Sequence, residues 1–169
     1  MMHIKAIEII ARSLRDSVKG DPEGRAQMAL GQYIAGMGFS NVGLGIVHSM
    51  AHPLSAVYDI PHGVACAILL TPVLKFNAPS TANKYRDIAV AMGVKNTEDM
   101  SIEQARQACI EAVEKLSVDV GIPQKLTQLG VKDEDLQFLS ESAFVDACTP
   151  GNPRDVSVEA IKEIYKSIM

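Results

Sequence analysis

Residues 42–70 read VGLGIVHSMAHPLSAVYDIPHGVACAILL, and this stretch decides the predicted fold. From about residue 42 to residue 57 it is apolar almost all round, which predicts a central helix without a solvent face of its own. A second apolar helix is expected over residues 61–70, with Pro72 kinking or ending it. The stretch therefore predicts two successive helices that lie in the interior of the fold.

The segments before this stretch carry helical patterns as well. Apolar residues recur every three to four positions over residues 4–18, and Gly20 follows as a stop signal. An Asp-Pro pair then opens a helix over about residues 22–39, whose many small residues suggest close approach to another helix or to a ligand. Residues 40–41, Ser-Asn, are expected to end that helix.

The rest of the chain predicts further helices and no sheet. Ser101 and Gln104 match a capping box, which marks the start of one helix. Sustained alternation of apolar and polar residues and a β-α-β rhythm are both missing, so the chain is predicted to be all-α. Its 169 residues suit a single all-helical domain spanning residues 1–169. The later helices are expected over residues 81–92, 101–120, 123–130, 133–147 and 157–168.

Composition excludes several classes of protein. The net charge is -4, from 20 acidic and 16 basic residues without a basic run, which argues against nucleic-acid binding. The three cysteines are widely spaced and odd in number, which suits a reducing compartment, and we expect the cytoplasm. The amino terminus has no signal-peptide pattern. The longest apolar run, residues 64–70, is far below the roughly 20 residues that span a bilayer, so no membrane segment is expected.

Three of the four histidines fall within fifteen residues: His48, His52 and His62. Positions four apart lie on one face of a helix, so His48 and His52 can reach one cavity, and a helix hairpin can return His62 to it. Each could instead be a core histidine that is hydrogen-bonded and inert. Burying three imidazoles without partners costs about 1 to 3 kcal/mol for each polar group, which favours a metal site.

The identity of the metal is left open by these residues. Three neutral imidazoles and a water satisfy zinc, whereas ferrous iron usually also takes a carboxylate. The nearest acid along the chain is Asp59, and Asp146 and Asp155 lie in the tail.

The segment GLGIVHSMAHPL at residues 43–54, followed by PHGVA at residues 61–65, resembles the signature of the iron-containing alcohol dehydrogenases. The resemblance extends over essentially the whole chain. Three further segments are similar to that family: GMGFSN at 36–41, KYRDIA at 84–89 and CTPGNPR at 148–154.

The resemblance implies a two-domain enzyme, of which this chain matches only the carboxy-terminal, all-helical, metal-holding domain. His48 and His62 match metal ligands of the family, and His52 matches a histidine beside the metal that helps to move a proton. Phe39 matches a position lining the substrate cavity. The implied cofactors are Fe2+, with Zn2+ possible, and NAD in the intact enzyme. The implied partners are a small alcohol or diol and its aldehyde, and a second copy in a homodimer.

The departures from the family pattern matter for activity. The family's Asp and His ligands, spaced D-x-x-x-H, have no counterpart here, and neither does its amino-terminal NAD-binding α/β domain. Cys66 stands where the family often has Asn. The isolated chain is therefore expected to be inactive and to bind metal weakly. Two other hypotheses about function stay open. The first is a stand-alone zinc hydrolase or lyase that uses all three histidines, and the second is a non-catalytic helical folding or oligomerising unit.

Overall fold

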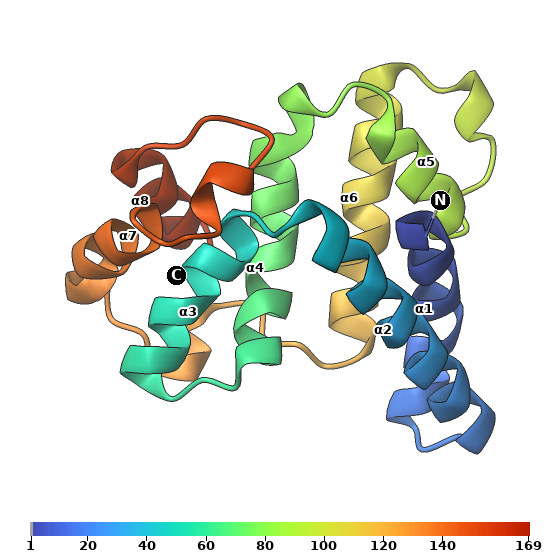
Figure 1. The fold of residues 1–169 in the computed structure, drawn as a ribbon, viewed down its shortest axis with the longest axis horizontal. Coiled ribbons are helices and arrows are strands. Elements are labelled where there is room, and N and C mark those ends of the chain that lie inside the picture. The colour runs from blue at the N-terminus through green and yellow to red at the C-terminus, as the bar shows by residue number, and fades with distance from the viewer. Residues whose placement is uncertain (1) are drawn as a thin grey trace. The chain divides into compact units, whose positions relative to one another are not determined.

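The structure, a computed structural model, describes residues 2–169, and every regular element within them is a helix. The all-α prediction is therefore confirmed. The chain forms two compact units (Figure 1). Unit 1 comprises the described residues through Val42 together with Thr81–Val120, and unit 2 comprises Gly43–Ser80 together with Gly121–Met169.

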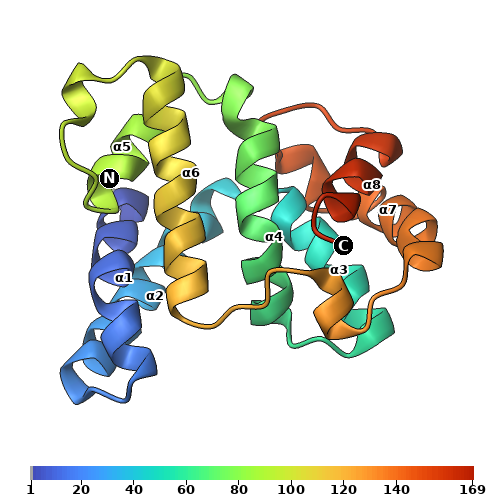
Figure 2. The same ribbon diagram turned by 180° about the vertical axis from the view of Figure 1, so that it is seen from behind.

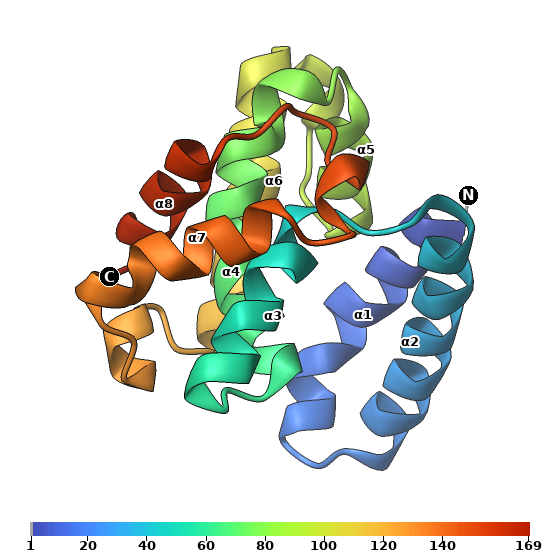
Figure 3. The same cartoon turned by 60° about the vertical axis from the view of Figure 1, so that its left-hand side comes forward.

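Unit 1 is built on a pair of long helices that lie side by side (Figure 3). Asp21 caps the second of them by accepting a hydrogen bond from the Gly24 N–H at 2.7 Å. A Cβ on Gly31 would lie 2.9 Å from Ile10, so the small residues of this helix do allow close approach to its neighbour, as predicted. The helices of unit 1 are α1 (Met2–Val18), α2 (Pro22–Val42), α5 (Lys84–Ala91) and α6 (Ile102–Asp119), with the 3-10 turn η2 (Thr97–Asp99).

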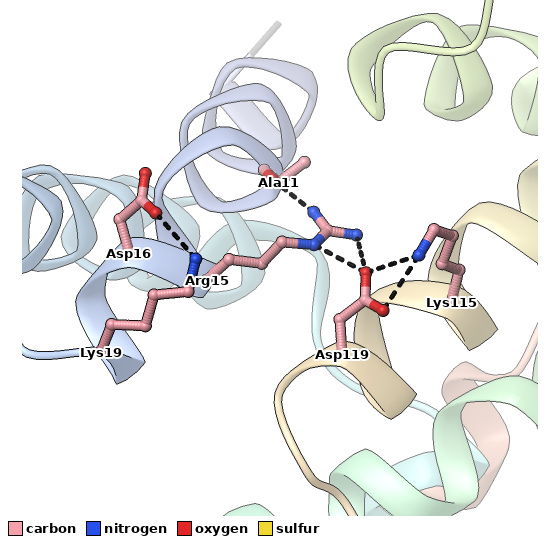
Figure 4. Close-up of polar contacts among 6 residues, drawn as sticks. All are labelled: Ala11, Arg15, Asp16, Lys19, Lys115 and Asp119. Carbon is pink, nitrogen blue, oxygen red and sulfur yellow. Dashed lines mark hydrogen bonds and ion pairs between the residues drawn. The ribbon is translucent and has the colours of Figure 1, made fainter.

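A charged contact links α1 to α6 within unit 1 (Figure 4). The guanidinium of Arg15 donates to Asp119 at 2.8 Å, and Lys115 donates to the same carboxylate at 2.9 Å. Hydrogen bonds from Lys115 and then from Arg15 lower the pKa of Asp119. The predicted capping box is also confirmed, because Ser101 and Gln104 exchange hydrogen bonds of 3.2 and 2.8 Å at the start of α6.

The predicted end of α2 at residues 40–41 is wrong. The helix continues to Val42, because the side chains of Ser40 and Asn41 donate back to the carbonyls of Gly36 and Met37 at 2.7 and 2.6 Å. Both polar groups are thereby satisfied without leaving the helix. Gly43 ends it, with a φ of 78° that favours glycine.

Unit 2 packs its four helices around one apolar core, and Figure 2 shows α4 beside α3 and α8. Met50, Leu54, Leu69 and Leu139 are fully buried in it. Tyr165 is buried with them, and its hydroxyl donates to the Met50 carbonyl at 2.6 Å. The α-helices are α3 (Ile46–Tyr58), α4 (His62–Asn77), α7 (Leu136–Phe144) and α8 (Val158–Lys166). The 3-10 turns are η1 (Ala78–Ser80), η3 (Leu126–Leu129), η4 (Asp133–Asp135) and η5 (Thr149–Gly151).

Two expectations for the central helices are corrected. The first helix begins at Ile46 and has a solvent face, on which His52 and Val57 are exposed. The second helix runs past residue 70 to Asn77 with Pro72 buried inside it, so Pro72 does not end the helix, while a kink at Pro72 stays a prediction. A proline lacks one N–H, and the packing of this helix in the core outweighs that loss.

The continuation of α4 lengthens the apolar segment. Among the described residues, His62–Ser80 is the stretch long and apolar enough to cross a membrane by length and composition alone. A helix in the core of a folded unit has the same composition, and Ile68, Leu69 and Val73 of α4 are buried in unit 2. The absence of a membrane segment stays a prediction.

Candidate metal centre

The structure brings the three clustered histidines together within unit 2. The ring centroids of His48 and His62 lie 5.5 Å apart, those of His52 and His62 lie 5.4 Å apart, and those of His48 and His52 lie 6.4 Å apart. His48 and His52 project from successive turns of α3, and His62 is the first residue of α4. The helix hairpin therefore gathers all three imidazoles at one place.

The connection between α3 and α4 produces this arrangement. Asp59 ends α3 in the left-handed region with a φ of 53°, which a short polar side chain tolerates. Ile60 is buried and anchors the turn in the core. Pro61 precedes α4, and its carbonyl accepts the N–H groups of Val64 and Ala65 at 2.8 and 3.0 Å. The chain thus reverses within three residues, and His62 returns to the histidines of α3.

The three rings differ in their surroundings. His48 is partly buried, and its pKa is lowered by that burial and then by the neighbouring His62 and His52, while Asp146 opposes the shift. A lowered pKa keeps the imidazole neutral near pH 7, which is the form that binds a metal. The side chain of His52 is 44% exposed, so the expectation that α3 lacks a solvent face is wrong at His52.

Asp146, which is far from the histidines along the sequence, is a direct partner of His52. Asp146 lies just after α7, and its Oδ2 is 2.8 Å from Nδ1 of His52. Its Oδ1 accepts the backbone N–H of Cys148 at 2.8 Å. Burial alone would raise the pKa of Asp146, but the Cys148 N–H and His52 lower it overall. Since 94 residues separate the pair, no local sequence pattern could have revealed it.

Cys66 is the other group at the site that sequence reasoning gave no role. Its Sγ lies 3.4 Å from Nε2 of His62, one helical turn away on α4. Burial raises the pKa of this thiol to about 11. The donor atoms form two sets, each within 4.8 Å of one another: His48, His62 and Cys66 in the first, and His52, Asp146 and Cys148 in the second.

These sets bear on which metal the site could hold. Imidazole and thiolate are ligands of zinc, and imidazole also suits iron. The first set contains the two histidines that the resemblance assigns to the metal, so the residues present fit a divalent ion as part of its coordination sphere. His52 instead belongs to the second set, which disfavours a site made of three histidines.

The carboxy-terminal loop is fixed against the start of α3. The hydroxyl of Thr149 is buried and lies 2.8 Å from that of Ser49, and it also donates to the Ala143 carbonyl at 2.7 Å. Gly151 packs so closely on Leu44 that an added Cβ would lie well under 3.0 Å from the Leu44 carbonyl oxygen. The loop that positions Asp146 and Cys148 is thus held in place by buried polar contacts and a close backbone approach.

Phe39, the residue predicted to line the substrate cavity, lies in unit 1. It is 46% exposed on α2 and, with Tyr33 and Met37, lines an open depression there. Its role in substrate binding stays a prediction.

Comparison with known proteins identifies, over the whole sequence, the family that the sequence was found to resemble. The sequence model described as "Fe-containing alcohol dehydrogenase family, C-terminal" matches residues 1–169. Lactaldehyde reductase of Escherichia coli K12 is 60% identical over 164 residues, which are 97% of this chain and 43% of that protein. The 1,3-propanediol dehydrogenase of Citrobacter freundii is 43% identical over 165 residues, which are 96% of this chain and 42% of that one.

Solved structures agree in fold. The crystal structure of a 1,3-propanediol oxidoreductase superposes with a TM-score of 0.95 at 41% identity, covering 98% of this chain and 44% of that one. An alcohol dehydrogenase from Oenococcus oeni gives a TM-score of 0.93 at 38% identity, with the same coverage. The chain spans less than half the length of each of these relatives.

Proposed function

We propose, from the premise that this chain belongs to the iron-containing alcohol dehydrogenase family, that it is the metal-holding part of an NAD-linked enzyme. The reaction is the interconversion of a short diol or alcohol and its aldehyde. The observation that carries the proposal is the convergence of His48, His52 and His62 at one place. The 60% identity to lactaldehyde reductase supports lactaldehyde and 1,2-propanediol as the substrate pair.

His48 and His62 hold a divalent metal, for which Fe2+ and Zn2+ are the candidates. Bound there, a divalent ion supplies Lewis-acid polarisation of the substrate oxygen. The lowered pKa of His48 supports this role, because a neutral ring leaves a nitrogen lone pair free for coordination.

His52 moves the proton of the substrate hydroxyl. Asp146 has a lowered pKa and is ionised at neutral pH, so its carboxylate can only accept a hydrogen bond, and Nδ1 of His52 must donate it. In the neutral ring that carries its proton on Nδ1, Nε2 of His52 has a lone pair that can take a proton from the alcohol. The exposure of the ring then allows the proton to pass to solvent, and the reverse path serves aldehyde reduction.

The nicotinamide cofactor provides the hydride acceptor and is bound by a part of the enzyme outside this chain. The same part provides the remaining metal ligands. The isolated chain is therefore inactive, and the active protein is a cytoplasmic homodimer. A reducing compartment suits the three cysteines, all of which are free.

A chimera tests the proposal. We would replace the matching 164 residues of the E. coli lactaldehyde reductase by this chain and measure NAD-dependent oxidation of 1,2-propanediol. The chimera should be active, and His48→Ala or His62→Ala should abolish both activity and metal retention. His3→Ala, in a histidine outside the cluster, is the matched control and should change neither. A folded, metal-loaded chimera that oxidises no short alcohol would contradict the proposal.

A further inference from the structure

A thiol lies beside the two histidines assigned to the metal. Cys66 and His62 are four residues apart on α4, so their side chains lie on the same face of the helix. The contact between Sγ and Nε2 measures 3.4 Å, and the ring nitrogen of His48 lies within 4.8 Å of both atoms. Three donor atoms from two helices therefore surround one point.

The spacing of the Cys66 and His62 atoms matches that of two ligands on one ion. With zinc–sulfur and zinc–nitrogen bonds of about 2.3 and 2.05 Å and a tetrahedral angle, two such ligand atoms lie about 3.6 Å apart. The observed 3.4 Å is close to this value. The sulfur and nitrogen could therefore bind one ion with little movement of either side chain.

We propose that Cys66 is a third metal ligand, together with His48 and His62. This inference rests on the proposed function for the assignment of the two histidines and deepens it by naming the metal that the site selects. When the ion binds, the Cys66 S–H bond breaks, a sulfur–metal bond forms, and the proton passes to solvent. No oxidant or reductant takes part.

The chemical consequence is a change in metal preference. Thiolate is a soft ligand that favours zinc and cobalt over ferrous iron, and zinc already ranks above iron for mixed nitrogen and sulfur sites. In the isolated chain, two imidazoles and one thiolate make up three of the four positions of a tetrahedral zinc ion, and water can fill the fourth. The chain should therefore retain zinc in preference to iron even though its relatives are described as iron-containing.

The other two cysteines offer matched controls. Cys148 belongs to the second donor set with His52 and Asp146, and Cys109 is buried in unit 1. Because all three thiols are free, a spectroscopic signal from sulfur can be assigned by removing one thiol at a time.

The test uses Co2+ added to the metal-free 169-residue chain under reducing conditions. We expect one ion per chain and a sulfur-to-cobalt charge-transfer band in the near ultraviolet. Cys66→Ser and Cys66→Ala should both remove the band and weaken zinc binding, measured by competition with cobalt, by about 10- to 100-fold. Cys148→Ala should keep the band, and circular dichroism should show unchanged helicity in every variant.

The outcomes separate this inference from the proposed function. If cobalt binds, depends on His48 and His62, and gives no charge-transfer band in the parent, the role of Cys66 is overturned while the histidine assignment stands. A band that survives in both Cys66 variants also overturns it. If the affinity for cobalt is unchanged by His48→Ala and His62→Ala, the assignment of these two histidines as metal ligands is overturned as well.

Discussion

The close approach of Gly151 to the start of α3 makes a sharp prediction about stability. A Cβ at this position would lie well under 3.0 Å from the backbone carbonyl oxygen of Leu44, a separation that real Cβ atoms essentially never show. The obstructing atom is backbone, which cannot rotate away as a flexible side chain could. Gly151→Ala must therefore displace either the carboxy-terminal loop or the residues that lead into α3.

The cost of Gly151→Ala follows from the overpacking of well-filled sites, which is typically about 1–3 kcal/mol. In a chain of this size, each kcal/mol shifts the melting temperature by about 2–4 °C, so we expect a fall of roughly 2–12 °C. Gly63→Ala is the matched control, because nothing lies within 4 Å of a Cβ there and Gly63 is already helical. It should leave the free energy of unfolding unchanged or raise it by up to about 1 kcal/mol.

Thermal and urea unfolding, followed by far-ultraviolet circular dichroism, measure both glycine variants on the same chain. Because Thr149, two residues before Gly151, is hydrogen-bonded to Ser49 of α3 beside His48, the same substitution should also weaken cobalt binding. If Gly151→Ala melts within about 1 °C of the parent, less than the shift that 1 kcal/mol produces, the close contact with Leu44 is not a packing constraint and the reasoning fails.

Three further predictions concern polar groups. Asp146→Asn should lower the turnover of the chimera about 10- to 100-fold, because an amide no longer fixes the donating nitrogen of His52; metal content should be unchanged, and a loss of metal instead would contradict a proton-transfer role. The lowered pKa of Asp119, due first to its hydrogen bond with Lys115, means that its stabilisation is present above the unfolded pKa and is lost as the pH falls through the folded pKa. Asp119→Asn should therefore destabilise the chain near neutral pH and flatten its acid unfolding curve, and an unaltered curve would refute this. Tyr165→Phe removes a buried hydrogen bond and should cost about 0.5–1.5 kcal/mol in urea unfolding, whereas a neutral result would show that the hydroxyl adds nothing.

The starts and ends of the helices could be predicted from the sequence where local signals alone determine them. They were predicted less well where tertiary packing or side-chain bonding opposes the local signal. Ser101 and Gln104 cap α6 as predicted, because a capping box satisfies its backbone groups within one turn. Pro72 does not end α4, since burial of the surrounding apolar residues is a tertiary contribution that a local rule omits. The predicted end of α2 at Ser40 and Asn41 was wrong for a similar reason. The side chains of these residues donate hydrogen bonds to the preceding turn, so the helix continues through them.

The candidate site was predictable only in part. His48 and His52 follow from helical spacing, and the return of His62 follows from the turn at Asp59, so their meeting could be expected from one short segment. Asp146 and Cys148 come from a loop almost a hundred residues later, and their position depends on how α7 packs against α3. Cys66 was visible as a departure from the family pattern, but its distance from His62 required coordinates.

Two of the histidines at the site are open to solvent, which bears on how the site is completed. His62 is exposed and His52 is 44% exposed, although a reaction that transfers hydride works best where water is excluded. Two or three protein ligands also leave coordination positions that the chain itself does not fill. The relatives contain a further part that this chain does not match. We therefore expect that part to shield the histidines from water as well as to supply metal ligands. Addition of that part in trans should then protect His52 and His62 from chemical modification, and His3, outside the cluster, should react equally in both states.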